Sequence, residues 1–164
     1  MVTSFGRPGL ESQYVSKTRK TPLSMSLIPS SVFLAVNGTL MRGLELNPNM
    51  LAVGATFVRE SHTEPAYRLW SIQDRHPAMI RVGQGQTGVA VAVEVWSVPP
   101  AGLADILLRE PPGLTIGKVR LTDGTIVLGV LGEPFLCEGQ REITSFRGWR
   151  TYVAAIHPDT QPRP

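Results

Sequence analysis

Residues 33–47, FLAVNGTLMRGLELN, join a strand-like apolar run to a turn whose residue types could bind an anion. Glycines let a backbone approach a ligand closely, and successive amide groups can form an anion-binding concavity. Thr39 adds a hydroxyl group, and Arg42 adds a fixed charge suited to a carboxylate. The alternative is an ordinary turn with a solvent-facing arginine. The candidate binding residues are Asn37, Gly38, Thr39, Leu40, Arg42 and Gly43.

Glu110 is the candidate catalytic residue, as a general acid or base. It closes an amphipathic helix expected over residues 100–110 and is followed directly by Pro111 and Pro112. The negative end of the helix dipole, and loss of solvent if the prolines pack against it, would both raise the pKa of its carboxyl group. Such a shift suits proton transfer near neutral pH. The alternative is a solvated glutamate at a helix end.

Other kinds of chemistry have less support in the sequence. His62, His76 and His157 are scattered, and none has metal-ligand spacing with another histidine or cysteine, so we expect no metal. We expect no cofactor either. His76 could act as an acid or base, although a surface turn before proline is the simpler interpretation. The nucleophile pattern G-x-S-x-G and the glycine- and serine-rich amidase signature are both missing. The glycine-rich residues 83–88 match no phosphate-loop spacing and are expected to form a hairpin loop.

Short β-rich segments separated by glycine and proline account for most of the chain. A helix is expected over 100–110, where Leu103, Ile106 and Leu107 repeat at helical spacing. The expected fold class is α+β, a small mixed, curved β-sheet or partly closed barrel with one or two short helices. The expected strands are residues 31–36, 52–59 (after an extended segment or helical turn), 66–72, 77–82, 89–98 and a hairpin over 116–131, before a β-rich or helical finish within 141–156.

The longest apolar alternation, VAVAVEVWSV over residues 89–98, predicts a central strand covered on both faces. Val89, Val91, Val93 and Val95 share one face, and Ala90, Ala92, Glu94 and Trp96 fall on the other. Asp123 and Gly124 supply a tight turn for the later hairpin.

The bulk composition predicts one domain over residues 31–157, between a basic tail at 1–30 and a C-terminal tail at 158–164. Apolar residues are 42% and charged residues 18% of the chain, which favours a globular protein. The net charge of +3 lies entirely in residues 1–30, so the neutral body argues against nucleic-acid binding. No apolar run is long enough to span a membrane, and no signal region is evident, so we expect a cytoplasmic protein. The single cysteine, Cys137, excludes an internal disulfide and is expected to be a small, near-core hydrophobe.

The glycine turn also carries a family resemblance. NGTLMRG, residues 37–43, resembles the Tyr-Gly-Ser/Thr-Leu-x-x-Gly loop of gamma-glutamylcyclotransferase-like domains, with Asn37 at the tyrosine position. A wider set of stretches, including AVEVWSVP, PPGLTIGKVRLTDG and EITSFRGWRTYVA, is similar to the C-terminal domain of allophanate hydrolase across residues 33–154. The chain is therefore identified as a stand-alone relative of that domain.

The resemblance implies a fold and a site. In gamma-glutamylcyclotransferase-like domains the loop backbone receives a substrate carboxylate or carbonyl, and a downstream glutamate, matched here by Glu110, acts as acid or base. In allophanate hydrolase an N-terminal amidase releases ammonia. The C-terminal domain is associated with decarboxylation of the resulting N-carboxycarbamate and with assembly of the enzyme.

Three functions follow as expectations. The first is an accessory protein of urea or allophanate nitrogen metabolism that binds a small carboxylate or carbamate beside the 37–43 loop, with Glu110 moving protons. The second is a non-enzymatic module that docks on a partner amidase. The third is a gamma-glutamylcyclotransferase-like enzyme that releases an amine. We expect no nucleic-acid or membrane partner, and a homodimer is left open.

Overall fold

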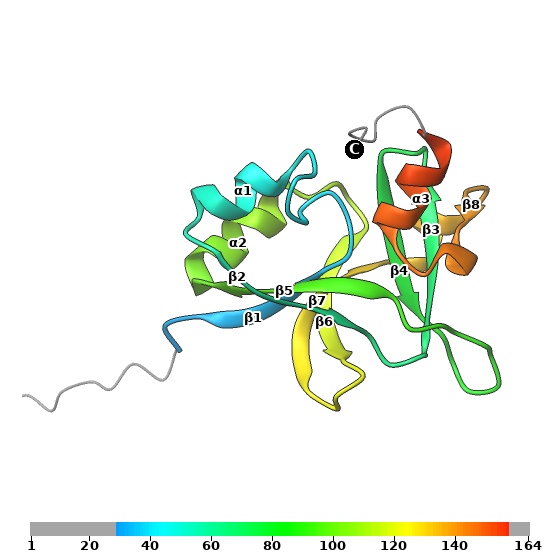
Figure 1. Ribbon diagram of the computed structural model, residues 1–164, viewed down its shortest axis with the longest axis horizontal. Coiled ribbons are helices and arrows are strands. Elements are labelled where there is room, and N and C mark those ends of the chain that lie inside the picture. The colour runs from blue at the N-terminus through cyan, green and yellow to red at the C-terminus, as the bar shows by residue number, and fades with distance from the viewer. Residues whose placement is uncertain (1–28, 158–164) are drawn as a thin grey trace, which may run out of the picture.

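The computed structural model describes residues 29–157. The expected tails at 1–30 and 158–164 therefore fall outside the described residues, apart from positions 29 and 30. Within the described part, eight strands, three α-helices and two short 3-10 helices follow one another (Figure 1). In chain order they are β1 (Val32–Val36), α1 (Asn47–Ala52), β2 (Thr56–His62), β3 (Tyr67–Ile72), β4 (His76–Arg81), β5 (Ala92–Val98), α2 (Pro100–Arg109), β6 (Leu114–Arg120), β7 (Ile126–Gly132), η1 (Pro134–Cys137), β8 (Arg141–Glu142), η2 (Thr144–Phe146) and α3 (Trp149–Ile156).

The strands form two sheets. The larger has the order β2-β5-β1-β7-β6, and the smaller has the order β4-β3-β8. The β1–β7 pair is parallel and the other pairs are antiparallel, so the larger sheet is mixed. The end of β2 reaches the end of β6 through one isolated bridge between Thr63 and Leu121. The expected mixed, curved sheet with few helices is confirmed. It does not close into a barrel, because the isolated bridge lies outside the strands β2 and β6 themselves.

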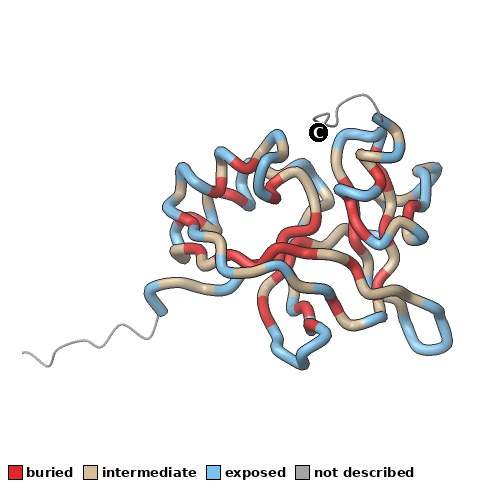
Figure 2. Tube along the Cα trace, viewed as in Figure 1, coloured by how far each residue is buried: buried red, intermediate tan, exposed pale blue. Residues whose placement is uncertain are grey.

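Helices α1 and α2 lie together on one side of the larger sheet, and α3 lies beside the smaller sheet (Figure 1). The buried residues run along the strands of the larger sheet and continue under the helices (Figure 2). Leu34, Trp96 and Ile106 are almost fully buried in this core. Gly102 permits the close approach of α1 and α2, because a Cβ atom there would come within 2.9 Å of the Val53 Cβ atom.

Several predicted segments shift by a few residues. The predicted strand at 52–59 is the end of α1 followed by β2, which agrees with the helical-turn alternative. The predicted strand at 89–98 begins only at Ala92 and lies between β2 and β1, one strand from the sheet edge. The stretch 141–156 holds the short strand β8, then η2 and α3, so its finish is helical.

Local sequence sets both ends of α2. Pro100 stands in the first turn, where its missing N–H costs nothing, and the helix ends at Arg109. Pro111 then disfavours the helical conformation at Glu110, which is extended with φ −69° and ψ 146°. The chain therefore turns away from the helix axis at the candidate catalytic residue.

Candidate functional site

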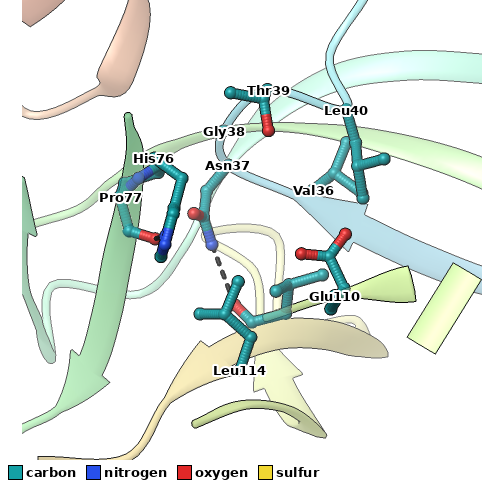
Figure 3. A pocket seen from close by; sticks show the side chains of 10 residues that line it. Val36, Asn37, Gly38, Thr39, Leu40, His76, Pro77, Glu110 and Leu114 are labelled. Atoms are coloured by element: carbon teal, nitrogen blue, oxygen red, sulfur yellow. Dashed lines mark hydrogen bonds between the residues drawn. The ribbon is translucent and has the colours of Figure 1, made fainter. Parts of the chain in front are cut away.

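The glycine loop and Glu110 line the same hollow. The hollow is partly open and holds about 280 Å³ when the space open to solvent is counted. Its walls come from the end of β1, the following loop, the start of β4, and the segments after α2 and in β7. Figure 3 shows the carboxyl group of Glu110 extending toward the loop, with His76 and Pro77 across the hollow. Its lining residues are Val36, Asn37, Gly38, Thr39, Leu40, His76, Pro77, Glu110, Leu114 and Val130. We call this the inner hollow.

The carboxyl group of Glu110 is half-buried and has no hydrogen-bond or ion-pair partner within residues 29–157. Burial raises the pKa of this carboxyl group above its ordinary value. A carboxyl group in this state keeps its proton to higher pH and can give it to a bound ligand.

In the loop, the carbonyl oxygens of residues 38–40 accept hydrogen bonds, whereas the amide groups of the same residues donate none within residues 29–157. The carbonyl oxygens of Gly38 and Thr39 accept from the amides of Met41 and Leu46, each at 3.0 Å, and the Leu40 carbonyl accepts from the side chain of Asn47 at 2.9 Å. The amides of Gly38, Thr39 and Leu40 have no acceptor in the part of the chain that the structure describes. Successive amides without an acceptor, on residues that line a hollow, can form an anion-binding concavity.

Two residues fix the loop against its neighbours. Asn37 is buried, and its side-chain amide donates to the Val130 carbonyl oxygen at 2.9 Å, which ties the end of β1 to β7 (Figure 3). Gly38 allows Pro77 to approach closely, since a Cβ atom at position 38 would lie 2.6 Å from the Pro77 Cδ atom. The side chain of Asn37 is thus engaged in holding the structure together.

A second hollow of about 470 Å³ shares Thr39, His76 and Glu110 with the inner hollow. We call it the outer hollow, and its other lining residues are Glu45, Leu46, Arg75 and Pro111. His76 Nδ1 lies 3.2 Å from the Pro77 carbonyl oxygen. A carbonyl oxygen can only accept, so Nδ1 carries the proton in this contact, and in the neutral ring Nε2 is the acceptor. From the sequence, His76 was predicted to be a surface histidine and Arg75 was not identified, because neither residue forms a motif with the loop.

Arg42 does not line either hollow. Its guanidinium group bonds to Glu60 at 2.7 Å and to Glu94 at 3.2 Å, and it stacks 3.5 Å above the centre of the Phe57 ring. Gly43, also outside the hollows, has a φ of 71°, a conformation that glycine adopts without strain. The structure therefore brings Asn37, Gly38, Thr39, Leu40 and Glu110 together and places Arg42 and Gly43 elsewhere.

Glu94 is the centre of the cluster that holds Arg42. It is 1% exposed and accepts from the Arg42 amide at 2.9 Å, from Arg150 at 2.8 Å and from the Trp96 indole at 3.1 Å. Burial by itself raises the pKa of Glu94, but these hydrogen bonds outweigh burial and hold the pKa below its ordinary value. Arg150 also donates to the Arg42 carbonyl oxygen at 2.6 Å. The sequence offered one signal for this cluster, a glutamate within an apolar alternating strand.

Other expectations concern metals, membranes and the cysteine. Within residues 29–157, no group of three metal-ligating side chains gathers at one place. No helix in that range is long and apolar enough to cross a membrane. Cys137 is half-buried, and burial raises the pKa of its thiol to about 11, so it is a poor nucleophile at neutral pH.

The sequence profile of the allophanate hydrolase C-terminal domain matches residues 32–154. The chain belongs to this family. A solved protein described as specific to uropathogenic E. coli is similar to it at 58% identity with a TM-score of 0.74, over 77% of this chain and 98% of that one. Allophanate hydrolase from Kluyveromyces lactis is similar at 31% identity with a TM-score of 0.72, over 77% of this chain and 21% of that one.

A curated urea amidolyase from Lachancea kluyveri is 32% identical over 129 residues, which is 75% of this chain. The match spans only 7% of the length of that relative. The expected kinship with allophanate hydrolase C-terminal domains is confirmed, and the mixed α+β fold is shared with that hydrolase. The family domain is thus a small part of some relatives and nearly the whole of another.

Proposed function

We propose that this domain binds a small carboxylate or carbamate in the inner hollow and that Glu110 exchanges a proton with it, in the cytoplasmic metabolism of urea or allophanate nitrogen. One observation carries the proposal: a half-buried carboxyl group with a raised pKa shares a hollow with three unpaired backbone amides. The amides of Gly38, Thr39 and Leu40 supply donors for an anion, and Glu110 supplies the proton. The names of the relatives, urea amidolyase and allophanate hydrolase, support the choice of pathway.

The reaction that fits best is decarboxylation of N-carboxycarbamate. One carboxylate of this dianion would bind the loop amides. As the bond between nitrogen and the other carboxyl carbon breaks, its electron pair passes to nitrogen, which takes the proton of Glu110. The products are carbon dioxide and carbamate, and the Glu110 carboxylate recovers a proton from water. Because Glu110 acts in its protonated form, the rate should fall as pH rises through its raised pKa.

Isotope labelling can test the step directly. An amidase that releases ammonia from ¹³C-labelled allophanate would generate N-carboxycarbamate in the cuvette, and NMR would follow labelled carbon dioxide and bicarbonate. The wild-type protein should accelerate their release, and Glu110→Gln should return the rate to that without protein. Glu133→Gln is the matched control, since Glu133 is exposed and lies outside both hollows. An unchanged rate in Glu110→Gln would remove Glu110 from the mechanism.

Binding can be measured separately from turnover. In ¹⁵N-labelled protein, acetate should shift the amide resonances of Gly38, Thr39 and Leu40 in a saturable way. If acetate shifts none of them, these amides are not the anion site.

A docking role is the second candidate. Leu108 is 86% exposed on α2, and Leu51 is 60% exposed on the neighbouring α1, so these helices present apolar side chains to solvent. An amidase is the natural partner, because the related domains lie within much larger allophanate hydrolase and urea amidolyase chains. Leu108→Glu should abolish co-purification with an allophanate-cleaving amidase, and Glu110→Gln should preserve it. Retention of the amidase by Leu108→Glu would contradict docking through this surface.

A further inference from the structure

The wall of the inner hollow across from Glu110 follows the turn between β3 and β4. His76 and Pro77, the first two residues of β4, form this wall (Figure 3). Pro77 also packs against the glycine loop, since its Cδ atom lies 2.6 Å from the place that a Cβ atom at Gly38 would take. A shift of the turn would therefore move this wall and the loop at Gly38 together.

The turn has a backbone conformation that its residues do not favour by themselves. Gln73 and Asp74 have φ angles of 52° and 57°, in the left-handed region that residues other than glycine seldom adopt. Residues remain in such a conformation when contacts with the surrounding structure hold them there. One of these contacts is a hydrogen bond from the Gln73 amide to the side-chain oxygen of Gln140, at 3.0 Å.

Asp74 makes the contact that ties the turn to a helix. Its Oδ1 atom accepts hydrogen bonds from the Ser71 hydroxyl, at 2.6 Å, and from the Tyr152 hydroxyl. The bond to Ser71 stays within the β3–β4 hairpin end, whereas Tyr152 lies in α3, 78 residues further along the chain. The Tyr152 hydroxyl therefore fixes the turn relative to α3.

Helix α3 is also bound to the glycine loop. Tyr152 is 1% exposed, and its ring lies against that of Trp149, with 5.5 Å between the ring centres. Two residues before Tyr152, Arg150 donates to the Arg42 carbonyl oxygen at 2.6 Å and to Glu94 at 2.8 Å. One helix thus holds the loop through Arg150 and the turn through Tyr152.

We propose that Tyr152 is a positioning residue for the inner hollow: its bond to Asp74 fixes the turn, and the turn sets the place of Gly38 through Pro77. This gives a role to the stretch EITSFRGWRTYVA, which carries the family resemblance but supplies no lining residue to either hollow. The inference rests on the proposed anion site and adds a residue that controls it without touching the ligand.

Removal of one hydroxyl group tests the link in the full chain without any ligand. Tyr152→Phe keeps the buried ring and should shift the ¹⁵N amide resonances of His76 and Gly38, because the turn is released from α3. Tyr67→Phe is the matched control, since Tyr67 is as buried as Tyr152 and lines neither hollow; it should leave both resonances in place. Unchanged resonances of His76 and Gly38 in Tyr152→Phe would overturn the inference.

Acetate measures the consequence for the site. Its affinity, followed at the loop amides at fixed pH and ionic strength, should fall about fivefold in Tyr152→Phe, the range of one hydrogen bond, and stay within about twofold in Tyr67→Phe. Urea denaturation of the same samples separates positioning from stability. A lower free energy of unfolding with unchanged acetate affinity would mean that the hydroxyl only stabilises the fold, which contradicts the positioning role.

A double-mutant cycle shows whether Tyr152 acts through Asp74. Asp74→Gly removes the acceptor, and glycine adopts the φ angle of this position without strain. In the Asp74→Gly background, Tyr152→Phe should change acetate affinity by less than about twofold, because the bond is already lost. The full effect of Tyr152→Phe in that background would overturn a path through Asp74.

The inference and the proposed function fail in different experiments. If wild-type protein binds acetate at the loop amides and Tyr152→Phe binds it equally well, the positioning role fails and the anion site stands. If acetate perturbs no loop amide of the wild-type protein, the proposed anion site fails. The resonances of His76 and Gly38 in ligand-free Tyr152→Phe then still decide whether Tyr152 positions the wall.

Discussion

Glu110 and Glu94 lie on two sides of one loop and show how differently a folded protein can treat the same side chain. Glu110 is half-buried, meets no hydrogen-bond or ion-pair partner among residues 29–157, and has its pKa raised by burial. Glu94 is far more buried, yet its pKa is lowered, because it accepts four hydrogen bonds from Arg42, Arg150 and Trp96. Burial alone therefore does not predict the direction of a pKa shift. The supply of donors decides it.

The difference extends to function. A carboxylate with four donors is stabilised in its charged form and acts as an anchor for the loop and α3. A carboxyl group without partners holds its proton more firmly and is available to a ligand. The Glu94 cluster holds the loop and α3 in place, whereas the hollow beside Glu110 is where we propose that a ligand binds.

The largest expected effect concerns Glu94. Glu94→Gln removes the negative charge that pairs with Arg42 and Arg150, and it should lower the free energy of unfolding by about 3 kcal/mol. This is the low end for a broken buried ion pair, because both arginines are partly exposed. Urea denaturation measures the change. Asp105→Asn, in an exposed helical pair with Arg109, should cost less than about 1 kcal/mol. Equal losses in the two variants would contradict the anchoring role.

The next effect concerns the contact that shapes the inner hollow. Gly38→Ala places a Cβ atom 2.6 Å from the Pro77 Cδ atom, so the loop or Pro77 must shift. Unfolding free energy should fall by about 1–3 kcal/mol, and anion binding at the loop should weaken. The control is Gly83→Ala, because a Cβ atom at Gly83 meets nothing within 4 Å; it should stay within about 0.5 kcal/mol of wild type. Full stability in Gly38→Ala would show that this contact is not tight.

The smallest effect concerns the stability contribution of Glu110 and its dependence on pH. The folded-state pKa is raised, so the folded state binds the proton more firmly, and the favourable contribution is present below the unfolded-state pKa and lost as pH rises through the folded-state pKa. Glu110→Gln should therefore gain stability relative to wild type between acidic and neutral pH. Urea denaturation at pH 4 and pH 7 measures this difference. A difference between the two proteins that stays constant with pH would contradict a raised pKa.

Much of the site could be predicted from local sequence. The apolar run ending in Asn37-Gly38 indicated a strand followed by a glycine turn. Glu110 before Pro111 indicated a carboxyl group at the end of a helix. The role of Arg42 could not be predicted, because its partner Glu94 lies 52 residues away and reaches it through strand pairing. Arg75 and His76 were missed for the same reason. They approach the loop only because β4 packs beside the end of β1.

The sequence alone determined the family, through its motifs, and the strand pattern and the glycine turn, because these depend on alternation and backbone freedom. It placed Glu110 inside a helix over 100–110, whereas the helix ends at Arg109 and Glu110 is extended. The tertiary structure decided which glutamate is paired and which has its pKa raised by burial. Pairing of β1 with β5 sets Val36 opposite Glu94, which brings the donors of Arg42 to that carboxylate, whereas Glu110 meets no donor among residues 29–157. Hydrogen bonds between residues distant in the chain form only once the sheet has assembled, and they set the direction in which the pKa of each carboxyl group shifts.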